Sequence, residues 1–194
     1  MPIKGCNSKE YASMLIYVEG ETEKYIFKDN FGLNTRRIGI NGDNVSVEAI
    51  FQNISTDLIS LKKPSEILIM FDREGRKETS KQIQDKLLEL LEKNFPVNTY
   101  HVIVTDRDIE SWIFSDIENT SKYFRKKLGN NNKFEGKSGC KEIKRLLGSG
   151  IYNKTYDGPR LIKTAKWSNI KKNNTNAENS GLDGIFSNCL WIKT

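Results

Sequence analysis

Three apolar segments of this chain each end at an acidic side chain, and this pattern limits the possible fold more than any other feature. The segments with their terminal acids are residues 14–18 before Glu19, residues 66–71 before Asp72, and residues 100–105 before Asp106. Their side chains are mostly apolar and do not alternate with polar ones, which is typical of strands buried on both faces. Strands of this kind belong to parallel sheets.

Helical patterns separate these strands along the chain. They cover residues 21–30, 45–61, 79–94 and 109–116, and a weaker strand is expected at residues 37–40. We therefore predict an α/β fold with a largely parallel central sheet and helices on both faces. Sheets of this kind bind ligands at the carboxyl ends of their strands, which is where the acids lie.

The last third of the sequence has weaker patterns. We expect short helices at residues 140–147, 159–167 and 182–192, and polar loops at residues 129–139 and 171–181. The predicted organisation is a core of residues 1–118, with residues 119–194 forming a basic, helical and loop-rich extension packed on it.

Charge is distributed unevenly between the two parts. Residues 1–116 hold 15 Lys and Arg against 19 Asp and Glu, whereas residues 117–194 hold 16 against 6. A strongly basic half indicates a polyanionic partner such as nucleic acid. Solubilising lysine in a chain rich in Lys, Asn and Ile explains the excess equally well.

Several features indicate a cytoplasmic protein with no membrane association. No apolar run approaches the roughly 20 residues that span a bilayer, and the first residues lack the apolar core of a secretory signal. The three cysteines, Cys6, Cys140 and Cys189, form no CxxC pair, so we expect neither disulfides nor a zinc site.

The acids at the strand ends predict a cation site. In a parallel sheet these ends share one edge, so several carboxylates would lie close together and repel one another unless a cation compensates them. Mg²⁺ prefers hard oxygen ligands and keeps waters for substrate phosphates. The alternative for each single acid is a structural role as a helix cap or first-turn charge.

Three segments resemble motifs of the Toprim superfamily. Residues 18–23 (VEGETE) resemble its first motif, a strand-terminal glutamate followed by glycine, and residues 71–75 (FDREG) resemble its second, an acid-any-acid sequence. Residues 110–116 (ESWIFSD) are similar to an acid-any-tryptophan helix of small Toprim-like proteins in bacterial defence and abortive-infection systems. These are related to OLD-type nucleases and often encoded beside an ATPase. The resemblance covers residues 12–118.

The resemblance implies a Toprim-like fold and Mg²⁺-dependent phosphotransfer, with Mn²⁺ as a substitute ion. By this analogy Glu19 is a metal ligand or the general base, Asp72 is a metal ligand with Glu74 beside it, and Glu110 completes the catalytic set. Glu74 stands where the family usually has aspartate. Asp106 and Asp108 form another acid-any-acid pair, and one of them is an alternative metal ligand.

Two groups of cations are candidates for binding phosphate or nucleic acid. Lys24, Arg73, Arg76 and Arg107 flank the acids, and Lys122, Arg125, Lys126 and Lys127 form a basic run on a predicted helix. The alternatives are ion pairs with the same acids and a solvated helix face. His101, the only histidine, lies inside a strand and is expected to be structural, which argues against a histidine base.

The leading hypothesis is a metal-dependent nuclease, a phosphodiester hydrolase acting on DNA or RNA as a defence-system effector. The alternative is a non-catalytic nucleic-acid-binding or complex-forming subunit that works with an ATPase partner, because the chain has no GxxxxGK[ST] motif of its own. Strand passage, which needs a catalytic tyrosine such as Tyr123, Tyr152 or Tyr156, ranks last.

Overall fold

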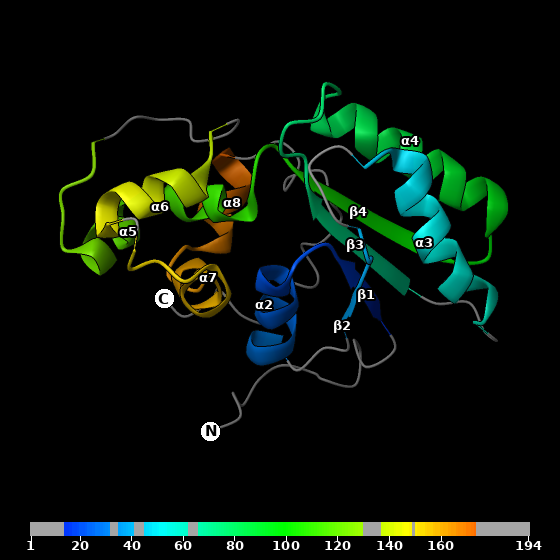
Figure 1. Cartoon of the computed structure of the whole chain (residues 1–194), viewed down its shortest axis with the longest axis horizontal. Helices are drawn as coiled ribbons and strands as arrows, with labels where there is room; N and C mark the ends of the chain where they lie inside the picture. The colour runs from blue at the N-terminus through cyan, green and yellow to red at the C-terminus, as the bar shows by residue number, and fades with distance from the viewer. Residues whose placement is uncertain are drawn as a thin grey trace.

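The computed structural model describes residues 14–31, 35–40, 45–61, 66–129, 137–148 and 150–173. Its centre is a four-stranded, entirely parallel sheet with the strand order β2-β1-β3-β4 (Figure 1). The strands are β1 (Leu15–Val18), β2 (Thr35–Arg37), β3 (Glu66–Asp72) and β4 (Thr99–Thr105). The α/β class and the parallel sheet expected from the sequence are therefore confirmed.

Helices follow the strands in chain order and then continue alone. They are α2 (Glu21–Phe31), α3 (Val47–Ile59), α4 (Ser80–Asn94), the 3₁₀ helix η1 (Ile109–Ser115), α5 (Ile117–Phe124), α6 (Gly139–Leu147), α7 (Lys154–Ile162) and α8 (Trp167–Asn173). None of the helices in the described ranges is long and apolar enough to cross a membrane.

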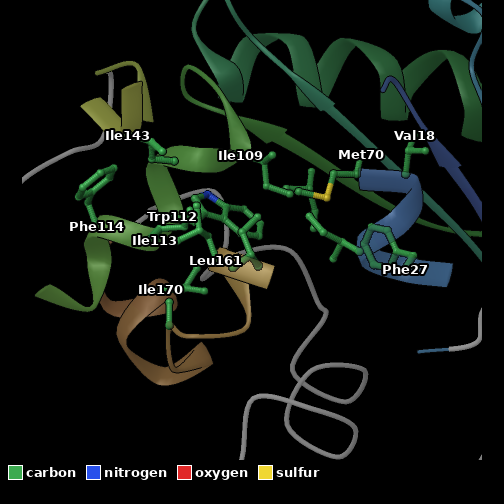
Figure 2. Close-up of a cluster of buried hydrophobic side chains, with 14 of the residues drawn as sticks. Val18, Phe27, Met70, Ile109, Trp112, Ile113, Phe114, Ile143, Leu161 and Ile170 are labelled. Carbon is green, nitrogen blue, oxygen red and sulfur yellow. The ribbon is translucent and has the colours of Figure 1, made fainter. Parts of the chain in front are cut away.

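Alternate strand residues build two separate cores. Tyr17 and Ile69 face a cluster with α3 and α4, while their neighbours Val18 and Met70 face a second cluster with α2 and the later helices. Figure 2 shows the second cluster running from the sheet through Trp112 into α7 and α8. This continuous core joins residues from both sides of the proposed boundary at residue 118.

Four elements differ from the sequence-based expectation. One of them is α8, which lies across the end of the helix expected at residues 159–167 and the start of the loop expected at residues 171–181. β2 lies at residues 35–37 instead of 37–40, because it is an edge strand whose arginines are exposed and so lack an apolar signature. Residues 109–115 form a 3₁₀ helix, and a separate α-helix follows.

The helix expected from residue 159 begins at Lys154, because Asn153 caps it by accepting hydrogen bonds from the amides of Thr155 and Tyr156. Pro159 lies inside it. The expected helix at residues 182–192 lies outside the described residues, as do most of the two expected loops.

The capping of α4 gives a prediction for stability. Thr79 Oγ accepts from the amide of Gln82 at 3.2 Å, and Gln82 Oε1 accepts from the amide of Thr79 at 2.9 Å. Thr79→Ala removes half of this reciprocal pair and is expected to lower the free energy of unfolding by about 1 kcal/mol. Urea denaturation measures the effect. Thr79→Ser keeps the hydroxyl, so equal losses in the two variants would contradict the assignment.

Candidate active site

The strand order places a topological switch point between β1 and β3. These two strands are neighbours, but the chain leaves β1 toward β2 on one side and leaves β3 toward β4 on the other. The connecting helices α2 and α4 contribute to opposite cores. Ligands of open α/β sheets bind in the crevice outside the strand ends at such a point.

Glu19 and Asp72 meet at this point. Asp72 is the last residue of β3, and its backbone amide donates to Oε2 of Glu19 at 3.0 Å. The Asp72 side chain is buried, and its Oδ1 accepts a 2.7 Å hydrogen bond from the hydroxyl of Thr105 at the end of β4. The strand ends therefore fix both carboxylates through hydrogen bonds between neighbouring strands.

Two further buried acids belong to the same cluster. Glu23, in the first turn of α2, accepts a hydrogen bond from the amide of Gly20 at 3.1 Å. A Cβ at Gly20 would lie 2.6 Å from that Glu23 oxygen, so the glycine of the first motif lets the carboxylate fold back onto the turn. Glu110, in the first turn of η1, is fully buried; its Oε1 accepts from Tyr152 at 3.2 Å and its Oε2 has no hydrogen-bond partner.

These acids hold protons more tightly than ordinary carboxyls. Burial, followed by the charges of Glu23 and Glu110, raises the pKa of Asp72 well above its usual value. Burial, with the charges of Glu110 and Glu19, raises the pKa of Glu23 to about 7. Burial also raises the pKa of Glu110. Ionising all of these acids is therefore unfavourable, and a bound cation would favour their ionised forms.

Lys154 supplies positive charge to this cluster. Its Nζ lies 3.7 Å from Oε1 of Glu110, and its side chain is 45% exposed. Although partial burial acts in the opposite direction, the charges of Glu110, Asp72 and Glu23 raise its pKa. The hydroxyl of Thr22 on α2 donates to the carbonyl of Lys154 at 3.3 Å, which fixes the start of α7 beside the acids.

The remaining predicted acids make contacts of other kinds. Asp106 pairs with Arg73 at 3.1 Å. Asp108 caps η1 through the amide of Ser111 at 3.1 Å and also accepts from the amide of Gly139 at 2.8 Å. The helix-cap alternative therefore describes Asp108. Glu74 has a positive φ of 52°, and its amide donates to the carbonyl of Arg107.

The arginines beside the acids hydrogen-bond to the backbone of the loops that follow β3 and β4. Arg73 Nε donates to the carbonyl of Asp106 at 2.6 Å, and Arg107 donates to the carbonyl of Glu74 at 2.8 Å. Arg76 is buried and donates to the carbonyl of Asp72 at 2.6 Å. These contacts tie the β3 and β4 loops together and hold the guanidinium groups on backbone oxygens.

The other predicted cations lie further from the strand ends or already have partners. Lys24 pairs with Glu21 at 3.3 Å. On α5, Lys122 pairs with Glu118 at 2.6 Å. The expected helix does not carry the rest of the basic run, because α5 ends at Phe124 and Arg125 caps it in the left-handed conformation. Lys126 contacts the carbonyl of Leu146, and Arg125 and Lys127 are exposed. Figure 1 shows α5 at the end of the molecule opposite α3 and α4. His101 pairs with Glu66, the first residue of β3, as expected of a structural histidine.

Glu19 and Asp72 are the candidate ligands for a Mg²⁺ ion. Across the described ranges, no three His, Cys, Asp or Glu side chains already form a cage for a metal ion. Mg²⁺ does not require one, because it is usually held by one or two carboxylates together with waters and substrate phosphates. Glu19 and Asp72, which are joined by the hydrogen bond from the Asp72 amide to the Glu19 carboxylate, would provide such a pair, and the unpartnered Oε2 of buried Glu110 would be a further oxygen in the same cluster.

The raised pKa of Glu23 gives a prediction for pH-dependent stability. A carboxyl whose pKa rises from 4.5 to about 7 on folding stabilises the fold fully below pH 4.5 and loses that contribution as pH rises through 7. Glu23→Gln is therefore expected to be more stable than the parent at pH 8, by about 3 kcal/mol, with a smaller difference at pH 5. Denaturant unfolding at both pH values without divalent ions measures this.

The exposed acid of the β3–α4 loop offers a control for this experiment, because Glu78→Gln removes the same charge outside the cluster. An equal gain from Glu78→Gln at pH 8 would show a general charge effect and would contradict the role of Glu23.

Comparisons with known proteins leave the family open. No protein-family model, curated protein or solved structure matches the chain. The Toprim resemblance therefore rests on the three short motifs alone.

Proposed function

We propose that this protein is a metal-dependent nuclease that hydrolyses phosphodiester bonds in nucleic acid. The observation that carries the proposal is the convergence of Glu19, Glu23, Asp72 and Glu110 at the switch point between β1 and β3. Three of these acids, Glu23, Asp72 and Glu110, are buried and have raised pKa values, which in such a position is typical of a functional site. Acids that repel one another in a buried cluster destabilise the fold, which favours a functional role for them.

The residues of the chain would divide the chemistry between them. Glu19 and Asp72 would hold Mg²⁺, which when bound would polarise the phosphodiester and activate water. Lys154 would contact a phosphate oxygen and stabilise its developing negative charge. Glu23, with a pKa of about 7, exchanges a proton near neutral pH and suits a general acid or base.

One observation favours a second candidate, a non-catalytic subunit that binds nucleic acid or an ATPase partner. Lys154 already places an ammonium 3.7 Å from Glu110, so part of the negative charge is compensated without a metal. Under this alternative the acids and the lysine form a structural network. The ATPase partner, the role in phage defence and the cytoplasmic location rest on the sequence and its resemblance alone.

A cleavage assay separates the two candidates. Purified protein is offered plasmid, single-stranded DNA and total tRNA, each with Mg²⁺, Mn²⁺ or EDTA. The nuclease proposal expects metal-dependent cutting of at least one substrate, lost by a factor of roughly 10² or more in Glu19→Ala. Glu78→Ala, an exposed acid outside the cluster, is the matched control. Cutting that survives EDTA or Glu19→Ala would reject the proposed site.

A further inference from the structure

A cavity between α2 and α7 lies outside the acid cluster. It has a volume of about 440 Å³ and is lined by aromatic, cationic and polar side chains together with Pro159. Tyr25 and Tyr156 are aromatic, Arg160 and Lys163 are cationic, and Asn153 and Thr155 are polar. The cavity falls within the size range of small-ligand sites. Both charged side chains of this described lining are cations, so the cavity suits an anion that carries an aromatic group.

One aromatic side chain in this cavity is already arranged for stacking. The guanidinium of Arg160 lies over the ring of Tyr156, 3.6 Å from its centre. The Tyr156 side chain nevertheless remains 58% exposed. Nucleic-acid bases that are not paired stack on tyrosine rings and on guanidinium planes, and adjacent cations bind the phosphates.

The cavity is one helical turn from the acid cluster on α2. Thr22, which bonds to the carbonyl of Lys154, and Tyr25, which lines the cavity, are three residues apart and share a face of that helix. On the other wall, Asn153 and Thr155 flank Lys154 in sequence. A strand whose phosphate contacts Lys154 would therefore bring a neighbouring nucleoside to the cavity.

We infer that this cavity binds one unstacked base and its phosphate from a single-stranded nucleic acid, next to the acidic site. The inference rests on the proposed function, because the bound strand would be the substrate of the acidic site. It names the substrate class of that site as single-stranded nucleic acid. Duplexes keep their bases stacked and paired, so they cannot fill the cavity without the cost of extruding a base. Single strands are therefore the preferred ligands.

Binding measurements in EDTA test the inference independently of cleavage. Short fluorescein-labelled pyrimidine oligonucleotides of DNA and of RNA, and a duplex of the same length, are titrated with the full chain while anisotropy is followed. We expect the single strands to bind at least about tenfold more tightly than the duplex, and the DNA and RNA arms show which strand is preferred.

The exposed tyrosine provides matched variants. Tyr156→Ala is expected to weaken single-strand binding about tenfold or more, because stacking is lost, whereas Tyr156→Phe keeps the ring and should bind within about twofold of the parent. Tyr123→Ala removes another exposed tyrosine that lies on α5 and does not line the cavity. It should bind like the parent.

The outcomes for the cavity and for the nuclease are distinguishable. Duplex binding equal to single-strand binding, equal affinities of Tyr156→Ala and Tyr123→Ala, or no binding by the parent would each overturn the inference. Loss of binding in Tyr156→Ala, with retention in Tyr123→Ala, would support the cavity even if no substrate is cleaved.

Discussion

Asp72→Asn is expected to abolish metal-dependent cleavage and, at the same time, to raise the temperature at which the protein unfolds. Asp72 is buried beside Glu23 and Glu110, and these surroundings raise its pKa, which means that its ionised form destabilises the fold. An amide of nearly the same shape removes that charge and still presents an oxygen to Thr105. The gain in stability and the loss of function therefore have a single cause.

Two measurements on the same samples check this prediction. Cleavage of whichever substrate the parent cuts should fall by a factor of roughly 10² to 10³. Thermal unfolding at pH 8 in EDTA should move upward by about 2–4 °C for each kcal/mol gained. Asp106→Asn is the control, because Asp106 is paired with Arg73 outside the buried cluster. If Asp72→Asn lowered the unfolding temperature, the buried charge would be stabilising and our account of the site would be wrong.

Gly139→Ala is expected to be the most destabilising small substitution in the described part of the chain. A Cβ at Gly139 would lie 2.1 Å from the amide nitrogen of Ser111 and 2.2 Å from the carbonyl carbon of Glu110. Both atoms belong to the backbone of η1, so no change of rotamer relieves the overlap. Helix α6 and η1 would have to separate, which also breaks the 2.8 Å hydrogen bond from the Gly139 amide to Asp108.

The expected loss is about 3 kcal/mol or more in the free energy of unfolding. Chemical denaturation measures it, and near-ultraviolet circular dichroism reports the packing of Trp112, which lies in the same 3₁₀ helix. Gly129→Ala is the matched control, because a Cβ there meets no atom within 4 Å. Equal stability of the two variants would show that α6 does not approach η1 as closely as described.

The sequence predicts the core elements of the fold well, because the burial of each element is visible in its own short stretch of sequence. β1, β3, β4 and α4 each carry a continuous apolar or amphipathic pattern that corresponds to their burial. The predicted bounds of β2 and α7 are wrong, because an exposed edge strand has no such pattern and because Pro159, a typical first residue of a helix, lies inside α7. Pairing with β1 decides where β2 lies, and the Asn153 cap decides where α7 begins. Neither contact leaves an apolar pattern in the sequence.

The candidate site is likewise predicted from the sequence only in part. Strand ends and motifs pointed to Glu19, Asp72 and Glu110, and the structure brings these three together with Glu23, which the first motif contains but which we did not assign to the site. Lys154 and Tyr152 were not assigned to it either. They reach the acids only through the packing of α7 on α2, and no spacing in the sequence reports such a contact.

That packing has a consequence for the order of events during synthesis. The ribosome makes a chain from its N-terminus, and domains fold as their segments emerge. All four strands and the acids precede Lys154 in the chain, so a nascent chain can pair its sheet before the lysine exists. Until α7 docks, the strand ends have the full repulsion of their carboxylates, and the apolar surface around Trp112 lacks its cover from α7 and α8. The acidic edge of the sheet therefore reaches its final charge balance only after α7 has been made.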